Sequence, residues 1–295
     1  MLAEVLRHLC PAQGEVHADG TVGAGGHSAA ILSQLGSEGF LLGIDRDPAA
    51  LQLAEKRLKP IGLPYTLRLG HFSQLRTHFA ASRGTSEAAL DGFLLDLGVS
   101  SMQVDQPQRG FSFQKDGPLD MRMTPDEADS AAELLQRLST AELATILRRY
   151  GEEPAARKIA AAIDRERRQR PICTTGELAS LVERVAPPTR GRRIHPATRT
   201  FQALRIAVNR ELEELEVVLR YLDRLVRPNG RVVILSYHSL EDRIVKRWVT
   251  TSERDGLFMS LTDGVERPTA EEIERNPRSR SARLRAVARR SSEST

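Results

Sequence analysis

Residues 15–28 decide the fold: Glu15-Val16-His17-Ala18-Asp19 runs into Gly20-Thr21-Val22-Gly23-Ala24-Gly25-Gly26, and His27-Ser28 follows. The first five residues read as a buried strand and the next seven as a glycine-rich turn. An apolar helix face then follows, ending at Gly36. Backbone N–H groups at such a turn, beside a helix N-terminus, bind anionic or carboxylate-bearing ligands. The stretch therefore predicts a ligand site at the end of the first strand.

The alternation continues outward from this turn. Further strands are predicted at 40–45, 65–69 and 92–97, with helices at 28–35, about 47–59 and about 73–81. Asp47-Pro48 opens the second helix with an N-cap acid followed by proline. Strands and helices in this order predict a parallel sheet covered by helices on both faces.

The alternation of strands and helices stops after residue 99. Residues 100–123 read as a loop, and four helical patterns follow up to Val185. A long helix is predicted over about 200–225, then a strand at 231–236 after the turn 227–230. Ser239 starts a helix, with Asp242 at capping-box spacing. Strands at 257–261 and 284–288 bring the sheet to seven. We expect a sheet domain formed by two segments, 1–122 and 200–295, with an inserted helical substrate-recognition domain, 123–199, between them.

Composition excludes several classes. The 295 residues are 40% apolar and 28% charged, close to an average soluble protein. Cys10 and Cys173 are far apart, which excludes a disulfide scaffold and a thiolate zinc site. Apolar stretches are strand-sized and no secretory signal is evident, so a cytoplasmic protein without a membrane span or a metal is expected.

The basic residues are unevenly placed. Of 43 basic residues 38 are Arg, a ratio that a GC-rich genome explains. Two acid-free stretches, 184–210 and 275–290, hold seven Arg each. Such runs are usually a solvated face, yet two of them favour an anionic partner. Aromatic residues are only 4%, which argues against a broad base-stacking platform.

Asp45 is the second site residue. It ends the second strand, 20 residues beyond Gly25, and suits an acid that accepts hydrogen bonds from ribose hydroxyls. A dinucleotide fingerprint needs Gly or Ala where this chain has Ser28, so the nicotinamide interpretation is weakened. The alternative is that Asp45 only caps a turn with Asp47.

Three further strand ends carry polar or aromatic groups. Asp96 ends an apolar strand and should face the same crevice as Asp45. Phe72, after the third strand, either stacks on a flat base or packs in the core. Tyr237 and His238 follow the fifth strand and, unlike Ser239 and Asp242, have no capping role to explain them.

Six segments together resemble one family, the bacterial 16S ribosomal RNA cytosine-N4 methyltransferases, RsmH or MraW. The resemblance covers nearly the whole chain in the right order. The segments are Asp19-Gly20-Thr21-Val22-Gly23-Ala24-Gly25-Gly26-His27-Ser28, Gly43-Ile44-Asp45-Arg46-Asp47-Pro48, Asp96-Leu97-Gly98-Val99-Ser100-Ser101, His195-Pro196-Ala197-Thr198-Arg199-Thr200-Phe201-Gln202-Ala203-Leu204-Arg205-Ile206, Ser236-Tyr237-His238-Ser239-Leu240-Glu241-Asp242-Arg243 and Asn276-Pro277-Arg278-Ser279-Arg280-Ser281-Ala282.

The resemblance implies a class I S-adenosylmethionine-dependent methyltransferase fold, that is, a seven-stranded Rossmann-like α/β sheet with an inserted small helical domain. It implies S-adenosylmethionine as methyl donor and a cytidine in the decoding centre of 16S rRNA as acceptor. The expected partners are 16S rRNA and the small ribosomal subunit, and a homodimer is left open. Carried over by position, the cofactor contacts are Gly25, Gly26, His27, Asp45, Phe72, Asp96 and Gln103.

Two departures from expected patterns matter. The family begins several residues earlier than the stretch matching 2–6, so we expect the start of this chain to be truncated or mis-assigned. Many amino-methyltransferases carry Asn/Asp-Pro-Pro-Tyr after the fourth strand, whereas this chain and this family have Asp96-Leu97-Gly98-Val99. That motif therefore cannot assign the catalytic groups.

The mechanistic hypothesis is direct displacement at the methyl group by the exocyclic N4 of cytosine. Asp96 or a neighbouring carbonyl accepts the amine hydrogens, and Tyr237 or His238 orients the base. Proton loss follows methyl transfer, and the base must leave any stack or pair. The RNA backbone is expected on the Arg-rich stretches 190–205 and 278–285. The candidate contacts are Arg192, Arg193, His195, Arg199, Arg205, Arg278 and Arg280.

Three alternatives stay open at this point. One is a nicotinamide-dependent oxidoreductase on the same fold. Another is a non-catalytic RNA-binding protein that keeps a vestigial cofactor pocket. The third is a methyltransferase that acts on DNA or protein.

Overall fold

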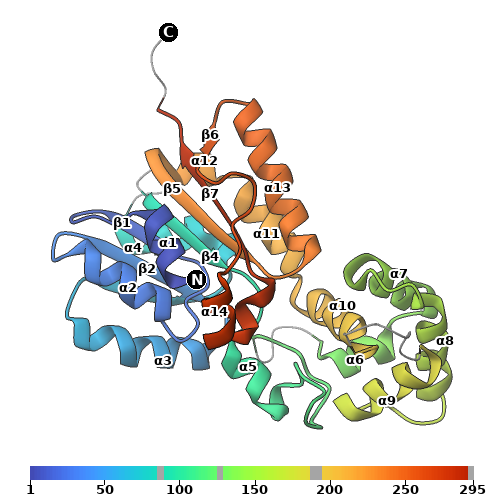
Figure 1. Cartoon of the computed structure of the whole chain (residues 1–295). Coiled ribbons are helices and arrows are strands. Elements are labelled where there is room, and N and C mark those ends of the chain that lie inside the picture. Colours follow the sequence, from blue (N-terminus) through green and yellow to red (C-terminus); the bar gives the residue numbers. More distant parts are fainter. Residues whose placement is uncertain (85–89, 125–128, 187–194, 292–295) are drawn as a thin grey trace. The chain divides into compact units, whose positions relative to one another are not determined.

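The computed structural model describes residues 1–84, 90–124, 129–186 and 195–291. The chain forms two compact units (Figure 1). The first, here called the core unit, comprises Met1–Gly98 and Leu212–Thr295. The second, the helical unit, comprises Val99–Glu211. The predicted inserted domain, 123–199, lies inside the helical unit, which extends further in both directions.

The core unit alternates strands and helices along the chain. Its strands are β1 (Val16–Asp19), β2 (Phe40–Asp45), β3 (Tyr65–Leu69), β4 (Leu90–Asp96), β5 (Val226–Ser236), β6 (Phe258–Ser260) and β7 (Arg283–Arg289). Its helices are α1 (Leu2–Leu9), α2 (Gly26–Leu35), α3 (Pro48–Leu58), α4 (Leu75–Arg83), α11 (Glu211–Leu219), α12 (Leu222–Leu225), α13 (Ser239–Arg254) and α14 (Ala270–Arg275), with 3-10 turns η1 (Lys59–Ile61), η2 (Phe72–Gln74) and η4 (Pro277–Ser281).

The seven strands form one sheet in the order β3-β2-β1-β4-β5-β7-β6, which confirms the predicted number of strands. β1 to β5 pair in parallel, while β7 is antiparallel to both β5 and β6. Alternate side chains of each buried strand enter two apolar cores, one on each face. Helices α1, α2 and α3 cover one face, and α4, α11, α12 and α13 cover the other. The C-terminal ends of β1, β2 and β4 therefore meet at one edge, where a ligand crevice is expected.

Three predictions about elements are corrected. The long helix over 200–225 is three helices, because Arg210 takes a left-handed conformation (φ 51°) between α10 and α11. The turn at 227–230 lies within β5, where the pairing register with β4 shifts and Asn229 has φ 66°. Residues 100–123 are not all loop, since they contain α5 (Ser101–Asp105) and η3 (Pro107–Arg109).

The helical unit is built from α5, η3 and five longer helices: α6 (Ala131–Arg137), α7 (Thr140–Gly151), α8 (Ala156–Arg167), α9 (Thr175–Val185) and α10 (Ala197–Asn209). Helices α6, α7 and α9 each begin at a capping box, in which a Ser or Thr and a Glu three residues on satisfy each other's backbone N–H groups. Helix α10 packs against α7, α9 and α6. This packing explains why the unit extends beyond residue 199.

Among the described residues, none of the helices has both the length and the apolar character to cross a bilayer.

Candidate active site

The glycine turn joins β1 to α2 in the core unit. Gly23 and Gly25 have positive φ (54° and 77°), which glycine adopts at little cost. A side chain at Gly25 would also place its Cβ 3.1 Å from the Cα of Ala54. Helix α2 has neither a side-chain cap nor an acid in its first turn. Its first N–H groups, at Gly26 and His27, are therefore available to a carboxylate or phosphate group.

Asp19 also belongs to this group of residues, although sequence patterns alone do not single it out. It is buried at the end of β1, where Oδ1 accepts from the N–H of Thr21 (3.0 Å) and Oδ2 accepts from the hydroxyl of Ser28 (2.6 Å). Burial raises the pKa of Asp19 to about 6. The Thr21 hydroxyl in turn accepts from the N–H of Asp96 (2.6 Å). Ser28, the departure from a dinucleotide fingerprint, thus has a local role in holding the turn.

Asp45 ends β2 and is held in place by the same turn. Its Oδ2 accepts from the N–H of Gly23 (2.7 Å) and its Oδ1 from the N–H of Asp47 (2.9 Å). The contact to Asp47 closes a turn, as in the alternative interpretation that Asp45 caps a turn with Asp47. A carboxylate oxygen has two lone pairs, so both oxygens retain accepting capacity for further donors. Burial raises the pKa of Asp45 above its ordinary value.

Asp96 ends β4 and is contacted from two sides. The phenol of Tyr237 donates to its Oδ1 (2.8 Å), and Nδ1 of His27 lies 3.4 Å from its Oδ2. Burial, together with the charge of Asp96, raises the pKa of Tyr237, so its phenol stays protonated and remains a donor. Three predicted site residues, Asp96, Tyr237 and His27, are therefore brought together.

The predicted capping role of Ser239 and Asp242 is wrong, because His238 caps α13 instead. The N-cap of α13 is His238, whose Nδ1 accepts from the N–H of Glu241 (3.3 Å). The Glu241 carboxylate accepts from the N–H groups of Tyr237 and His238 (2.8 and 3.3 Å). Asp242 instead accepts from Arg285 (2.9 Å). An accepting Nδ1 places the ring proton on Nε2, which lies 3.1 Å from the Glu241 carboxylate.

Phe72 and Gln103 complete the predicted cofactor set. Phe72 begins η2 after β3 and is only 7% exposed, packed in the apolar core of one sheet face. Core packing therefore accounts for most of its surface. Gln103 lies in the helical unit, buried, where it forms a capping box with Ser100 at the start of α5.

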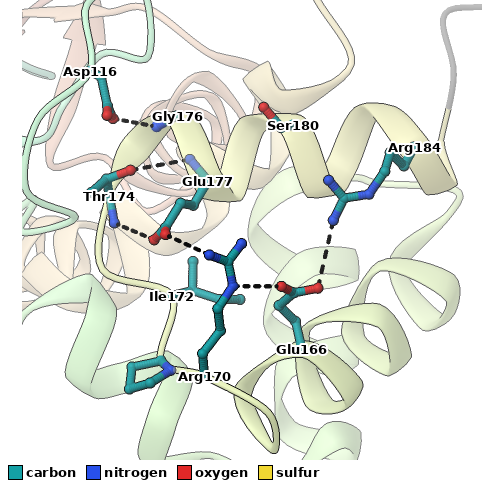
Figure 2. A pocket seen from close by; sticks show the side chains of 10 residues that line it. Asp116, Glu166, Arg170, Ile172, Thr174, Gly176, Glu177, Ser180 and Arg184 are labelled. Carbon is teal, nitrogen blue, oxygen red and sulfur yellow. Dashed lines mark hydrogen bonds and ion pairs between the residues drawn. The ribbon is translucent and has the colours of Figure 1, made fainter.

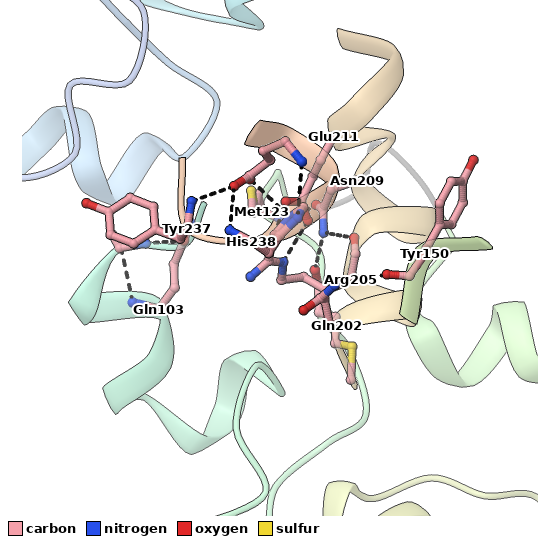
Figure 3. Close-up of polar contacts among 12 residues, drawn as sticks. Gln103, Met123, Tyr150, Gln202, Arg205, Asn209, Glu211, Tyr237 and His238 are labelled. Atoms are coloured by element: carbon pink, nitrogen blue, oxygen red, sulfur yellow. Dashed lines mark hydrogen bonds and ion pairs between the residues drawn. The ribbon is translucent and has the colours of Figure 1, made fainter. Parts of the chain in front are cut away.

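The predicted RNA-binding residues fall into three groups. Arg192 and Arg193 lie outside the described residues. In the helical unit, Arg205 forms a bidentate pair with Glu211 (both contacts 2.8 Å) (Figure 3), Arg199 donates to the backbone oxygen of Glu152, and His195 contacts Glu183 (2.8 Å). Arg278 and Arg280 lie in the core unit, where both are exposed on η4.

The described residues fit a nucleoside-containing cofactor with a carboxylate tail. Asp45 offers an oriented acceptor for hydroxyl groups, and the open N-terminus of α2 offers donors for a carboxylate. Asp96 offers a second acceptor at the end of β4, the strand that pairs with β1.

The strand order with an antiparallel β7, together with acids after β1, β2 and β4, defines a class I S-adenosylmethionine-dependent methyltransferase fold. The chain belongs to the MraW methylase family, which matches residues 1–290. It is a methyltransferase with S-adenosylmethionine as its cofactor, as the sequence predicted, and the nicotinamide alternative is excluded.

Two relatives, both called "Ribosomal RNA small subunit methyltransferase H", match nearly the whole chain. The protein from Acidobacterium capsulatum is 44% identical over 97% of this chain and 96% of its own. The protein from Granulibacter bethesdensis is 47% identical over 97% of this chain and 89% of its own. Among solved structures, an rRNA methylase from Streptococcus thermophilus covers 98% of this chain and 92% of its own, with 14% identity and a TM-score of 0.42. That structural similarity is too low to support a conclusion about function.

Proposed function

We propose that this protein transfers the methyl group of S-adenosylmethionine to the exocyclic N4 of a cytidine in the decoding centre of 16S rRNA. The partner is the small ribosomal subunit, and the reaction takes place in the cytoplasm. The observation that carries the chemistry is the Asp96 carboxylate at the end of β4, held by the Tyr237 phenol. Near-full-length similarity to proteins named as small-subunit rRNA methyltransferases supports the choice of substrate.

The cofactor would be held by groups of the core unit. The first N–H groups of α2, at Gly26 and His27, would bind its carboxylate, and Asp45 would accept from its ribose hydroxyls. When bound, S-adenosylmethionine supplies a methyl group on a positively charged sulfur that an amine can displace. Gly25 lets the turn take this shape, because its backbone has a conformation that other residues rarely adopt.

Asp96 would act on the amine of the cytosine. The lone pair of this amine is delocalised into the ring, which makes it a poor nucleophile. A carboxylate oxygen that accepts an N–H of the amine aligns it and stabilises the positive charge that develops on nitrogen. Tyr237 fixes this carboxylate through Oδ1, and the proton released from N4 passes to the Asp96 carboxylate or to water.

His238 would contribute orientation rather than proton transfer. Its Nδ1 is occupied by the N–H of Glu241 and its Nε2 carries the ring proton. That proton lies beside the Glu241 carboxylate (3.1 Å), and Nδ1 cannot accept a proton without breaking the cap of α13. A proton acceptor for the amine is better supplied by Asp96.

RNA binding would use the remaining predicted residues. Arg192, Arg193, Arg199, Arg278 and Arg280 offer cations for the phosphate backbone, and His195 offers a ring beside them in the sequence. Replacing both Arg192 and Arg193 with Ala is expected to weaken RNA binding and to flatten its salt dependence, while S-adenosylmethionine affinity stays unchanged. Loss of cofactor affinity in this variant would contradict the assignment.

The test is methyl transfer from labelled S-adenosylmethionine to undermethylated small ribosomal subunits, followed by nucleoside analysis. N4-methylcytidine is the expected product, and fully methylated subunits should take up no label. Another methylated nucleoside would overturn the choice of acceptor atom. Cofactor binding without transfer to the subunit would favour a non-catalytic RNA-binding protein, and label on DNA or protein would favour a different substrate class. A homodimer stays a prediction, which sedimentation during the same assay checks.

A further inference from the structure

The positive charge of the helical unit is concentrated in one region of its sequence. Residues 148–210 contain 15 Lys and Arg against six Asp and Glu. The structure separates these cations into those that already have an acidic partner and those that do not. The distinction matters because an arginine neutralised by its own carboxylate must give up that pair before it can bind an external phosphate.

Several exposed arginines are paired. Arg168 lies 2.8 Å from Asp164, and Arg170 lies 3.1 Å from Glu166. Figure 2 shows Arg170 and Arg184 converging on Glu166 in a polar hollow that also holds Asp116 and Glu177. Three acids and two arginines line this hollow, so it offers no excess positive charge to an anion.

A second hollow has the opposite character. It is an open cavity of about 780 Å³ where α7 ends and α8 begins, and its lining includes Arg148, Arg157 and Lys158. These three side chains are exposed, and none of them forms an ion pair or hydrogen bond with another residue in the described ranges of the chain. Both helices and their connection can be followed in Figure 1.

Two acids also line this hollow. Glu153 is buried, and its Oε1 accepts from the N–H of Ala155 (2.8 Å), so this carboxylate serves the local turn. Glu152 is exposed, and its backbone oxygen accepts from Arg199 (3.1 Å). Arg199 is one of the residues predicted to bind RNA. The hollow therefore adjoins that residue while keeping three cations that, among the described residues, have no partners.

The start of α8 lines the same hollow. Its N-cap, Ala155, makes no side-chain cap bond and its first turn has no acid, but the Glu153 carboxylate accepts from the N–H of Ala155 and offsets part of the positive charge there. The N–H groups at a helix N-terminus carry partial positive charge and favour anions. At α8 that partial charge is combined with Arg157 and Lys158 on the same turn, next to Arg148 from α7.

We propose that this hollow, formed by Arg148, Arg157 and Lys158, binds phosphate groups of the RNA backbone and anchors the substrate on the helical unit. The proposal rests on the proposed function only in taking RNA as the substrate. The ligand chemistry is a phosphodiester anion, which three exposed cations without partners among the described residues are suited to bind.

The test replaces all three cations in the full-length protein: Arg148→Gln, Arg157→Gln and Lys158→Gln. The matched control removes three paired arginines of the same unit, Arg137→Gln, Arg168→Gln and Arg170→Gln, so both variants lose the same charge. Binding of a labelled 16S rRNA fragment is measured by fluorescence anisotropy across a salt series, and circular dichroism checks folding. We expect the hollow variant to bind at least about tenfold more weakly and its salt slope to fall by about 2, whereas the control changes little.

Equal losses in the two variants would overturn the proposal, because net charge alone would then explain binding. An unchanged salt slope in the hollow variant would overturn it as well. The measurement needs no methyl transfer, so it is independent of the proposed reaction. If the wild-type protein binds RNA through the hollow but fails to methylate subunits, only the proposed function fails. If subunits are methylated while the slope is unchanged, only this inference fails.

Discussion

The two units of the molecule use charge in different ways. The core unit has 24 basic and 24 acidic residues, whereas the helical unit has 19 and 15, so the whole net charge of +4 belongs to the helical unit. In the core unit, the carboxylates of Asp19, Asp45 and Asp96 are held by backbone and hydroxyl donors at strand ends. In the helical unit, several of the described cations face solvent without a partner. This difference agrees with the proposal that the core unit holds the chemistry and the helical unit supplies charge for a polyanion.

The largest expected effect is at the core unit. Asp96→Asn keeps the shape of the side chain but removes the negative charge that would stabilise the developing positive charge on N4. We expect the rate of methyl transfer to fall by about 10²–10³-fold while RNA affinity stays unchanged. Steady-state assays with saturating cofactor measure this. Asp242→Asn is the matched control, because that carboxylate is committed to Arg285. A variant at Asp96 with wild-type rate would remove it from the mechanism.

Arg205 tests the comparison from the other side, because it is a predicted RNA-binding residue with an internal partner. Its guanidinium pairs with Glu211, and both side chains are mostly buried (16% and 7% exposed). Arg205→Ala leaves a buried carboxylate unpaired, and we expect the free energy of unfolding to fall by about 3 kcal/mol. Urea denaturation measures this, with Arg199→Ala as the milder control. Should Arg205→Ala reduce RNA affinity at full stability, the residue would belong to the RNA surface instead.

A variant at Tyr237 tests how the hydrogen bond to Asp96 contributes to the reaction. Tyr237→Phe removes the phenol O–H while keeping the ring, so the carboxylate loses one donor. A hydrogen bond to a charged group is worth about 1.5–3 kcal/mol, so we expect the rate to fall by about 30-fold. Calorimetry of cofactor binding is the accompanying readout, and its result should match the wild type. A loss of cofactor affinity equal to the loss in rate would assign Tyr237 to cofactor binding.

The smallest expected effect concerns Asp19 and pH. Its pKa is raised by burial to about 6, so the folded protein keeps a proton that the unfolded chain loses near pH 4. This contribution to stability is present at low pH and is lost as the pH rises from about 4 to about 6. Asp19→Asn should remove it, changing the stability difference between about pH 4.5 and about pH 7.5 by at most about 2 kcal/mol.

Denaturation of the wild type and the Asp19 variant at both pH values isolates the contribution of Asp19 to the pH dependence of stability. Asp116→Asn is a control that should leave this interval nearly unchanged, because the N–H of Gly176 lowers the pKa of Asp116 and its titration lies below the interval. If Asp19→Asn left the pH dependence unaltered, the buried carboxyl would not titrate in this window.

The sequence predicted the strands of the core unit well, because each apolar run is bounded by polar or glycine residues. The strands at 40–45 and 65–69 have the predicted bounds. The break at Arg210 could not be predicted, since residues 200–225 contain neither glycine nor proline. Asn209 stabilises this break by donating to the backbone oxygens of Met121 and Arg205, and the contact to Met121 links residues far apart in the sequence.

Parts of the candidate site follow from the sequence, and several of its contacts do not. Acids at strand ends were visible in the sequence, which located Asp45 and Asp96. The bond from Ser28 to Asp19 was not visible, because it joins residues nine apart across a turn. The cap of α13 was placed one residue late, since serine is a commoner N-cap than histidine. The pairing of Arg205 with Glu211 depends on the break at Arg210 and could not be anticipated either.

The most direct test of the division between the two units is single-turnover methyl transfer at subsaturating and saturating RNA. It compares Tyr237→Phe with the variant lacking Arg148, Arg157 and Lys158. We predict that saturating RNA restores the wild-type rate to the triple variant but not to Tyr237→Phe, because only the first is defective in binding RNA. If saturating RNA restores Tyr237→Phe, or leaves the triple variant slow, chemistry and RNA affinity are not divided between the units as described.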